Sequence, residues 1–279
     1  MNLSPFVISI AILGSFSATQ AIAKTTQLQS EVISSSEIQW GYLNPLRGDK
    51  SPGAANLWGD RTKNMPTGML VKFNKGFSSP PHIHNITYRG VVIKGQMHND
   101  DPDAATMWMP TGSFWTQPAG ENHITSANGE ANTIFLEIDS GPYLVKPSDQ
   151  HFDSGEKPIN LHESNHVWLN PTDVSFINGN DVQMTALWGS NADGQLGGTM
   201  VKIPAGYKGE IDVDAEEFRG IVIAGNLQYQ SAKTDNAKAL NAGSYFGSTG
   251  QFSHNIEAAE NGATIYIRTD GKYQLNTQP

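Results

Sequence analysis

The sequence predicts an all-β chain made of two tandem jelly-roll barrels. Short runs rich in β-branched and aromatic residues are bounded by Gly, Pro, Asn and Asp throughout, and helical periodicities are few. The 279 residues include 28 Gly and 15 Pro, a composition suited to a globular protein with many turns. The chain also repeats itself at a constant spacing. Short strands with frequent turns favour a double-sheet jelly roll, and the repeat predicts two of them.

The repeat has a period of about 130 residues, too long for a solenoid, and indicates a duplicated domain. Leu57-Trp58-Gly59, for example, recurs as Leu187-Trp188-Gly189. The matching segments are 57–59 and 187–189, 68–72 and 198–202, 89–95 and 219–225, 112–115 and 243–246, and 133–136 and 264–267.

The predicted organisation follows from the repeat and from the polar segments around it. A tether or first edge strand is expected at 24–38, because this segment is polar and rich in Ser and Gln. The first barrel is expected at 39–147, a linker at 148–165 and the second barrel at 166–279. Residues 231–242 are expected to form a short helix or an insertion loop.

Residues 1–23 are typical of a cleaved secretory signal. An apolar run, 6–16, is followed by the small-x-small sequence Ala21-Ile22-Ala23. The leading residues contain no Lys or Arg, which argues against a signal, but the run is far shorter than the ~20 apolar residues of a membrane anchor. We therefore expect a periplasmic or secreted protein without a membrane span after cleavage.

Composition excludes several functional classes. The formal net charge of −9, with no basic cluster, argues against a nucleic-acid partner. The chain has no cysteine, which excludes disulfides, thiolate metal sites and a thiol nucleophile. The motifs of serine hydrolases, P-loop proteins and HExxH metalloproteases are also absent.

Three histidines are the candidate metal ligands. His82 and His84 stand two apart beside a β-branched run, so on a strand both would face the same side. His123 follows a turn formed by Pro118 and Gly120. Three imidazoles suit Zn, Fe, Mn, Ni or Cu. The alternative is one surface histidine and two hydrogen-bonded core histidines, but three converging imidazoles in an apolar barrel are costly without a metal or hydrogen bonds.

At these residues the chain resembles the cupin superfamily, and within it a group of uncharacterised bacterial cupin-like proteins. The first cupin motif is G-x5-H-x-H-x3-4-E-x6-G, and the second is G-x5-P-x-G-x2-H-x3-N. The first is matched by Gly76, His82, His84 and Gly95, and the second by Gly112, Pro118, Gly120 and His123. The resemblance implies a duplicated, bicupin-type chain and a metal site in the first barrel.

The chain departs from the motifs at the fourth metal ligand. Tyr88 stands where the cupin glutamate belongs, either as a phenolate ligand or, as we favour, lining the pocket. A three-histidine site has open positions, which a catalytic metal requires. Some cupin dioxygenases are known for three-histidine iron sites, so the resemblance permits oxygen chemistry. Glu121 is the nearest carboxylate to His123 in sequence. It is a general base, a hydrogen-bond partner of a metal ligand, or a solvated loop residue.

The second copy lacks the paired histidines. The repeat offset places Asp212 and Asp214 at the positions of His82 and His84, and His254 at that of His123. These three could hold a hard metal, but we favour a decayed, structural site. Arg89 has a counterpart in this copy, Arg219, which favours a structural salt bridge over substrate binding.

Two functions are favoured over a third, a structural β protein whose metal affinity has no physiological role. The first is an enzyme that uses one divalent ion, Fe, Zn or Mn, on a small organic molecule, by dioxygenase-like chemistry with iron or by hydrolysis or isomerisation with zinc or manganese. Tyr88 and Glu121 are then the candidate catalytic residues. The second is a non-catalytic periplasmic protein that binds or senses a metal or ligand. A monomer or a homodimer fits either function.

Overall fold

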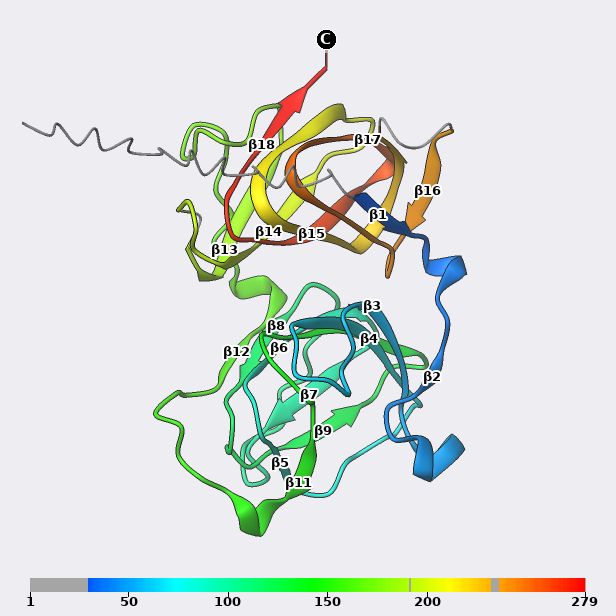
Figure 1. Cartoon of the computed structure of the whole chain (residues 1–279), viewed down its shortest axis with the longest axis vertical. Coiled ribbons are helices and arrows are strands. Elements are labelled where there is room, and N and C mark those ends of the chain that lie inside the picture. The colour runs from blue at the N-terminus through cyan, green and yellow to red at the C-terminus, as the bar shows by residue number, and fades with distance from the viewer. Residues whose placement is uncertain (1–29, 191, 232–235, 279) are drawn as a thin grey trace, which may run out of the picture.

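A computed structural model describes residues 30–190, 192–231 and 236–278, and it has two lobes stacked one above the other (Figure 1). The first lobe, at the bottom of Figure 1, contains strands β2 to β12; the second contains β1 and β13 to β18. The prediction of an all-β chain is confirmed. The sheets are open at their edges, however, so they are not the closed barrels that the sequence predicted.

The first lobe is built on a seven-stranded antiparallel sheet. Its strand order is β12-β8-β6-β10-β4-β3-β2. Alternating residues of these strands enter the core, as the buried side chains of Val71, Val92 and Ile134 show. The strands are β2 (Gly41–Tyr42), β3 (Gly53–Trp58), β4 (Thr67–Phe73), β6 (Tyr88–Lys94), β8 (Phe114–Gln117), β10 (Asn132–Ile138) and β12 (Ile159–Leu161).

Two short strand pairs complete the first lobe and carry the candidate site. One pairs β5 (His82–His84) with β11 (Val145–Pro147), and the other pairs β7 (Met97–Asp100) with β9 (Ile124–Ala127). Four short 3₁₀ turns connect strands in and around this lobe. They are η1 (Ser35–Glu37), η2 (Pro45–Lys50), η3 (Ser148–Gln150) and η4 (Glu163–Asn165).

The second lobe is a seven-stranded sheet dominated by two long strands. β15 (Lys208–Gln230) and β17 (Tyr245–Thr269) pair with each other along most of their length, and register shifts bend them. β14 pairs with β17, β13 with β14, and both β16 and β18 with β15. The remaining bounds are β13 (Gln183–Gly189), β14 (Gly197–Ile203), β16 (Lys238–Asn241) and β18 (Lys272–Thr277).

Strand registers in the two lobes follow the sequence repeat. Thr133 pairs with Lys72 in the first lobe, and Thr264 pairs with Lys202 in the second. The bulge before Trp58 in β3 also has a counterpart before Trp188 in β13. Related pairs and bulges at the same places are what two copies of one domain would produce, although duplication itself stays a prediction.

The segments outside the repeat differ in part from expectation. β1 (Ser30–Ile33) is an edge strand, but it pairs with β17 in the second lobe, so the N-terminal segment crosses to the far sheet. The expected linker contributes β12 to the first sheet. A short helix or an insertion loop was expected within 231–242, but 238–241 form the strand β16; 232–235 lie outside the described residues. The predicted signal, residues 1–23, also lies outside them.

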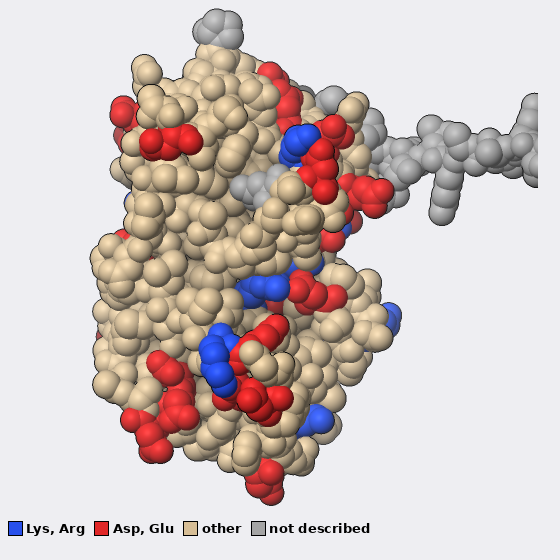
Figure 2. Space-filling model, turned by 90° about the vertical axis from the view of Figure 1, so that its left-hand side faces the viewer, with Lys and Arg blue, Asp and Glu red and all other residues tan. Residues whose placement is uncertain are grey.

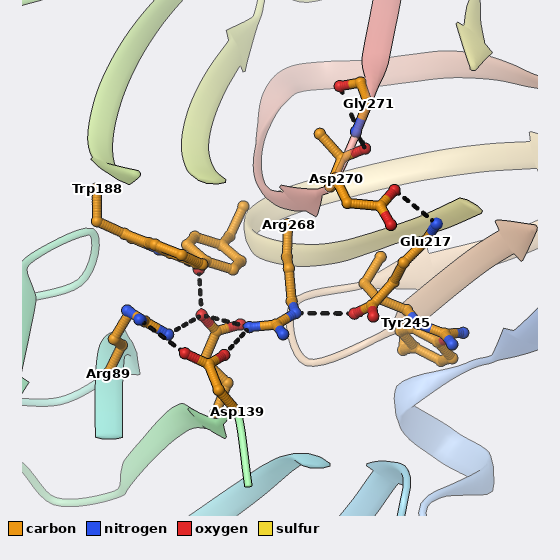
Figure 3. A network of polar contacts seen from close by, with 12 residues as sticks. Arg89, Asp139, Trp188, Glu217, Tyr245, Arg268, Asp270 and Gly271 are labelled. Atoms are coloured by element: carbon orange, nitrogen blue, oxygen red, sulfur yellow. Dashed lines mark hydrogen bonds and ion pairs between the residues drawn. The ribbon is translucent and has the colours of Figure 1, made fainter. Parts of the chain in front are cut away.

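The lobes are held together by a shared apolar core and a buried ionic network. Phe135 and Leu70 of the first lobe pack in one cluster with Tyr245 and Ile221 of the second. Above this cluster, Arg268 of β17 lies 2.7 Å from Asp139, 2.8 Å from Glu217 and 3.4 Å from Glu137 (Figure 3).

Two aromatic residues of the second lobe, Tyr266 and Trp188, contact this network. The Tyr266 hydroxyl donates to Glu137 (2.8 Å) and accepts from Trp188 Nε1 (2.8 Å). Arg89 pairs with Asp139 (2.9 Å) and stacks over the Trp188 ring (Figure 3). Arg89 therefore makes the structural salt bridge expected from sequence, and the network connects strands from both lobes.

Acidic and basic side chains lie beside one another on the face in Figure 2. None of the helices that the structure describes is long and apolar enough to cross a membrane.

Candidate metal centre

The backbone of two strands brings His82, His84 and His123 together. In β5, Ile83 stands between His82 and His84, so the two histidine side chains share one face of the strand. His82 and His123 form an antiparallel bridge in which each N–H donates to the other's carbonyl at 3.0 Å. One ring nitrogen of each histidine lies within 4.8 Å of the others, and all three side chains are buried.

Each of the three imidazoles is held by a backbone carbonyl at the same nitrogen, Nδ1. Nδ1 of His82 lies 2.9 Å from the Pro80 carbonyl, that of His84 lies 3.0 Å from Leu144, and that of His123 lies 3.2 Å from Glu121. A carbonyl only accepts, so each Nδ1 carries the proton. Each Nε2 then carries a lone pair and no proton, the form of histidine that binds a metal.

Electrostatics also keep these imidazoles neutral. Burial lowers the pKa of all three; for His84, the neighbouring His123 and His82 lower it further, to well below the ordinary value. The pKa of His123 falls to about 3, because of burial and then the charge of His82. Proton binding is therefore suppressed in the range where a metal ion would compete for the lone pairs.

Two tyrosines lie against the triad. The Tyr88 hydroxyl is 3.5 Å from His123 Nε2, and the Tyr143 hydroxyl is 3.2 Å from His84 Nε2. Burial raises the pKa of both phenols, so they remain protonated. Tyr88 thus lines the site as a neutral phenol, which agrees with the preferred alternative from sequence and gives no support to a phenolate ligand.

A chain of hydrogen bonds runs from Tyr88 to the carbonyl that holds His123 Nδ1. The Tyr88 hydroxyl donates to Asn99 Oδ1 (2.9 Å), and Asn99 Nδ2 donates to Gln117 Oε1 (2.9 Å). Gln117 Nε2 donates to the Glu121 carbonyl (3.1 Å), the same oxygen that holds His123 Nδ1. Because Tyr88 gives its proton to Asn99, its oxygen faces the His123 lone pair with no proton between them.

Glu121 contributes to the site through its backbone. Its carboxylate lies 3.4 Å from Lys157 at the surface. No Asp or Glu joins the histidine cluster within the described part of the chain. The geometry therefore does not bring the Glu121 carboxylate to the triad, where the general-base hypothesis needs it.

A pocket of about 450 Å³ opens beside the triad and falls in the usual size range of small-molecule sites. Its walls include His82, His84 and Tyr88, together with the apolar side chains of Phe73, Leu136 and Tyr143. The triad is thus reachable from a mostly apolar cavity.

The second lobe does not reproduce this site. Asp214 is exposed and Asp212 accepts a hydrogen bond from Asn276 (2.9 Å), whereas Ile211 and Val213 fill the core between them. His254 is buried, and its Nδ1 and Nε2 contact the hydroxyls of Tyr229 (2.7 Å) and Ser248 (3.0 Å). Burial lowers its pKa to about 3. The favoured interpretation, a structural remnant, agrees with this geometry.

Comparison with known proteins places the chain in a family. The sequence matches the family described as Domain of unknown function (DUF4437) over residues 31–276. The chain belongs to this family. No curated protein matches it.

Solved structures share its fold at low sequence identity. A provisionally assigned dioxygenase from Nostoc punctiforme aligns with a TM-score of 0.66 at 14% identity, covering 90% of this chain and 87% of that one. A vicilin from Solanum lycopersicum gives 0.56 at 12% identity, covering 88% and 87%. An oxalate decarboxylase–formate complex from Lactobacillus farciminis gives 0.54 at 11%, covering 88% of both chains.

These neighbours are cupin-fold proteins, so the cupin resemblance seen in the motifs is supported at the level of fold. Their names differ in chemistry, and a shared fold does not carry a reaction with it. The function of this chain has to be argued from its own site.

Sequence reasoning missed several residues of the site. Asn99 and Gln117 are buried polar residues on strands, which is a signal that such residues have specific partners. Tyr143 stacks on His84 at 4.4 Å between ring centroids, although it is far from both motifs in the sequence.

Proposed function

We propose that His82, His84 and His123 hold one divalent metal ion. The chain would then be a metal-dependent cupin that acts on a small organic molecule in the first lobe. The observation that carries the proposal is that a backbone carbonyl holds Nδ1 of each of the three clustered imidazoles. Each is tethered at Nδ1 to a carbonyl, which leaves three neutral nitrogens clustered within 4.8 Å.

The His123 nitrogen supports a cation rather than a hydrogen-bonded core. Its lone pair faces the Tyr88 oxygen at 3.5 Å, and the only proton of that hydroxyl belongs to Asn99. Two acceptors facing each other in a buried site are unfavourable unless a cation lies near them. A metal ion on the triad satisfies this lone pair.

The donor set restricts the metal to ions that accept imidazole, such as Fe(II), Zn(II) or Mn(II). When bound, iron would supply oxygen chemistry, and zinc or manganese would act as a Lewis acid in hydrolysis or isomerisation. The chain's own residues would bind and orient the substrate. The pocket would exclude water, and the neutral hydroxyls of Tyr88 and Tyr143 would position groups beside the triad.

The second candidate function is non-catalytic binding or sensing of a metal or ligand. It is favoured by the absence of an Asp or Glu from the triad among the described residues, because general acid–base catalysis commonly uses such a group. The two functions predict the same metal and differ in turnover.

The test is metal content followed by turnover. Protein purified without chelators or a polyhistidine tag is expected to contain nearly one metal ion by plasma mass spectrometry, and His82→Ala and His84→Ala to contain almost none. His98→Ala, which removes a buried histidine of the same lobe outside the triad, is the control and is expected to keep the metal.

Turnover separates the enzyme from the binding protein. Protein reloaded with Fe(II), Zn(II) or Mn(II) is incubated with a cell extract, and small molecules are followed by mass spectrometry. Depletion that His84→Ala abolishes supports the enzyme; saturable retention without depletion supports binding. If wild type, variants and control are equally empty after reloading, the metal hypothesis is wrong.

A further inference from the structure

Among the described residues, one charged side chain lines the pocket beside the triad, that of Arg47. We propose that this pocket takes an amphipathic organic monoanion, with its carboxylate or equivalent acid at Arg47 and its apolar body inside the cavity. The inference deepens the proposed function by naming a substrate class, and it rests on that function only for the end of the molecule that meets the triad.

The walls select for an apolar body. The aromatic rings of Phe73, Phe77 and Trp115 and the aliphatic side chains of Val71 and Ile134 line the cavity. Trp115, Val71 and Ile134 are almost fully buried, so they form its inner end. A ligand that fills this end is held by burial of apolar surface, in a volume suited to a molecule of modest size.

The rim supplies the charge. Arg47 belongs to η2, an exposed strap over the pocket, visible in Figure 1 as the blue coil near β2. The strap is closed at its base, where Leu43 N–H donates to the Pro52 carbonyl (2.8 Å) and Asn44 N–H to Ser51 Oγ (2.9 Å). Asn44 Oδ1 also accepts from Leu46 N–H (3.0 Å). These bonds hold the backbone of the strap that carries Arg47 to the pocket.

The Arg47 guanidinium is available for a ligand. Every other arginine among the described residues has a side-chain carboxylate or carbonyl within reach, whereas Arg47 has no ion pair there. Among the described residues, no Asp or Glu lines the pocket. In a chain of formal net charge −9, an unpaired cation at an apolar pocket favours an anion at this place.

The geometry of guanidinium suits an acid group in particular. Its planar donors bind a carboxylate or sulfonate through two parallel hydrogen bonds. A neutral ligand of the same shape would leave these donors to water and would gain only the apolar contacts. Charge at the rim and apolar walls inside thus recognise different ends of one molecule.

Two dyes that differ only in an acid group test the proposal. 8-Anilinonaphthalene-1-sulfonate carries a sulfonate that N-phenyl-1-naphthylamine lacks, and both fluoresce in apolar pockets. Affinities are measured by titration on wild type, Arg47→Gln and Lys50→Gln. Lys50 is a cation of the same strap that does not line the pocket, which makes it the matched control.

The expected result is an anion preference that depends on Arg47. Wild type and Lys50→Gln should bind the sulfonate about three- to tenfold more tightly than the neutral dye, the range for an ion pair at a partly solvated rim. Arg47→Gln should lose the preference and keep the neutral dye unchanged. Equal affinities in wild type, absence of binding by either dye, or a preference that survives Arg47→Gln would overturn the proposal.

A second variant tests whether the dyes bind inside the pocket. Val145 lies in the pocket wall and is 57% exposed, so Val145→Trp narrows the mouth at little cost to folding. It should weaken both dyes together; unweakened binding would place the anion outside the pocket and also overturn the proposal. All titrations are run on metal-free and zinc-loaded protein, so that anion binding without metal would separate this inference from a failure of the metal site.

Discussion

His123 and His254 occupy related positions in the two lobes, and their surroundings differ in one respect that decides their roles. Both are fully buried, and burial lowers the pKa of each to about 3. In the second lobe both nitrogens of His254 contact hydroxyls, at 2.7 and 3.0 Å. In the first lobe the Nε2 lone pair of His123 faces the Tyr88 oxygen and two other imidazoles.

The partners of these histidines explain the difference. Asn99 and Gln117 of the first lobe stand at the strand positions that Tyr229 and Ser248 occupy in the second. Asn99 pairs with Thr125 as Tyr229 pairs with Ile256. Gln117 pairs with Tyr88 as Ser248 pairs with Phe218. Tyr229 and Ser248 point their hydroxyls at His254. Asn99 and Gln117 instead bond to each other and lead to the carbonyl that holds His123 Nδ1. Hydroxyl groups contact both nitrogens of His254, whereas the contacts in the first lobe bring no proton to Nε2 of His123.

The comparison teaches that a buried histidine with low pKa is not by itself a functional signal. Desolvation alone lowers the pKa in both lobes. What separates His123 from His254 is the contact of Nε2, which lies with two other imidazoles in the first lobe and against the Ser248 hydroxyl in the second.

The largest expected effect is on metal content. His84→Ala should reduce bound metal from nearly one ion per chain to almost none, because two imidazoles hold a metal far more weakly than three. His254→Gln should leave the metal content unchanged, since His254 already has two partners. Plasma mass spectrometry of both variants checks this, and metal loss in His254→Gln would contradict the contrast between the lobes.

The next effect concerns how far the lobes depend on each other. Arg268→Met leaves Glu137, which is fully buried, with its charge only partly compensated, and should lower the free energy of unfolding by about 3–5 kcal/mol. Lys208→Met removes an exposed ion pair with Glu257 and should cost no more than about 1 kcal/mol. Urea unfolding measures both. A small loss for Arg268→Met would mean that the interface network contributes little to stability.

Removal of Asn99 should weaken metal binding without abolishing it. Asn99→Ala breaks the chain of hydrogen bonds that orients His123. Loss of a hydrogen bond that orients a metal ligand typically costs about 10–100-fold in metal affinity. Tyr229→Phe is the matched variant in the second lobe. It should lower stability by about 1 kcal/mol and leave metal affinity unchanged. Zinc titrations in competition with a chelating dye, together with melting curves, separate the two outcomes.

The smallest effect is a shift in the pH dependence of metal binding. The folded-state pKa values of His82, His84 and His123 lie below the ordinary value of about 6.5, so protons compete for the lone pairs only at lower pH. With zinc well above its Kd at pH 7, occupancy should stay above half at about pH 5.5. Half-loss at pH 6.5 or higher would indicate ordinary histidines.

The same shifts give a sign for stability. Because these pKa values, and that of His254, are lower when folded than when unfolded, their contribution to stability is present above about pH 6.5 and is lost as pH falls toward the folded values. Metal-free protein should therefore melt at lower temperature as pH decreases below 6.5, and melting curves across this range check it.

The sequence predicted the all-β fold, the position of the triad and the structural role of Arg89, because these depend on motif spacing and strand alternation. His82 and His84 are two apart, and that spacing alone fixes a shared face. The repeat offset, in contrast, set Asp212 and Asp214 at the positions of His82 and His84, whereas Ile211 pairs with His254 as His82 pairs with His123. Asp212 and Asp214 face outward, because Ile211 and Val213 take the core positions of that strand.

Contacts between distant segments could not be predicted. Tyr143 reaches His84 from beyond β10, Arg47 reaches the pocket from the strap before β3, and β1 crosses to the second lobe. Each depends on how loops of irregular length pass over the sheets. For Glu121 the sequence predicted a contact that the structure does not show. Its closeness to His123 in sequence suggested that its carboxylate would reach the site, but the turn presents its backbone carbonyl to His123 instead.

The most direct test of the central claim is an anomalous difference map from crystals of the metal-loaded protein, recorded at the absorption edge of the metal found. We predict one peak, bonded to His82, His84 and His123 through Nε2, and none at His254. A peak at His254, or an ion bound through Nδ1, would contradict the account, as would a crystal that holds metal only at its surface.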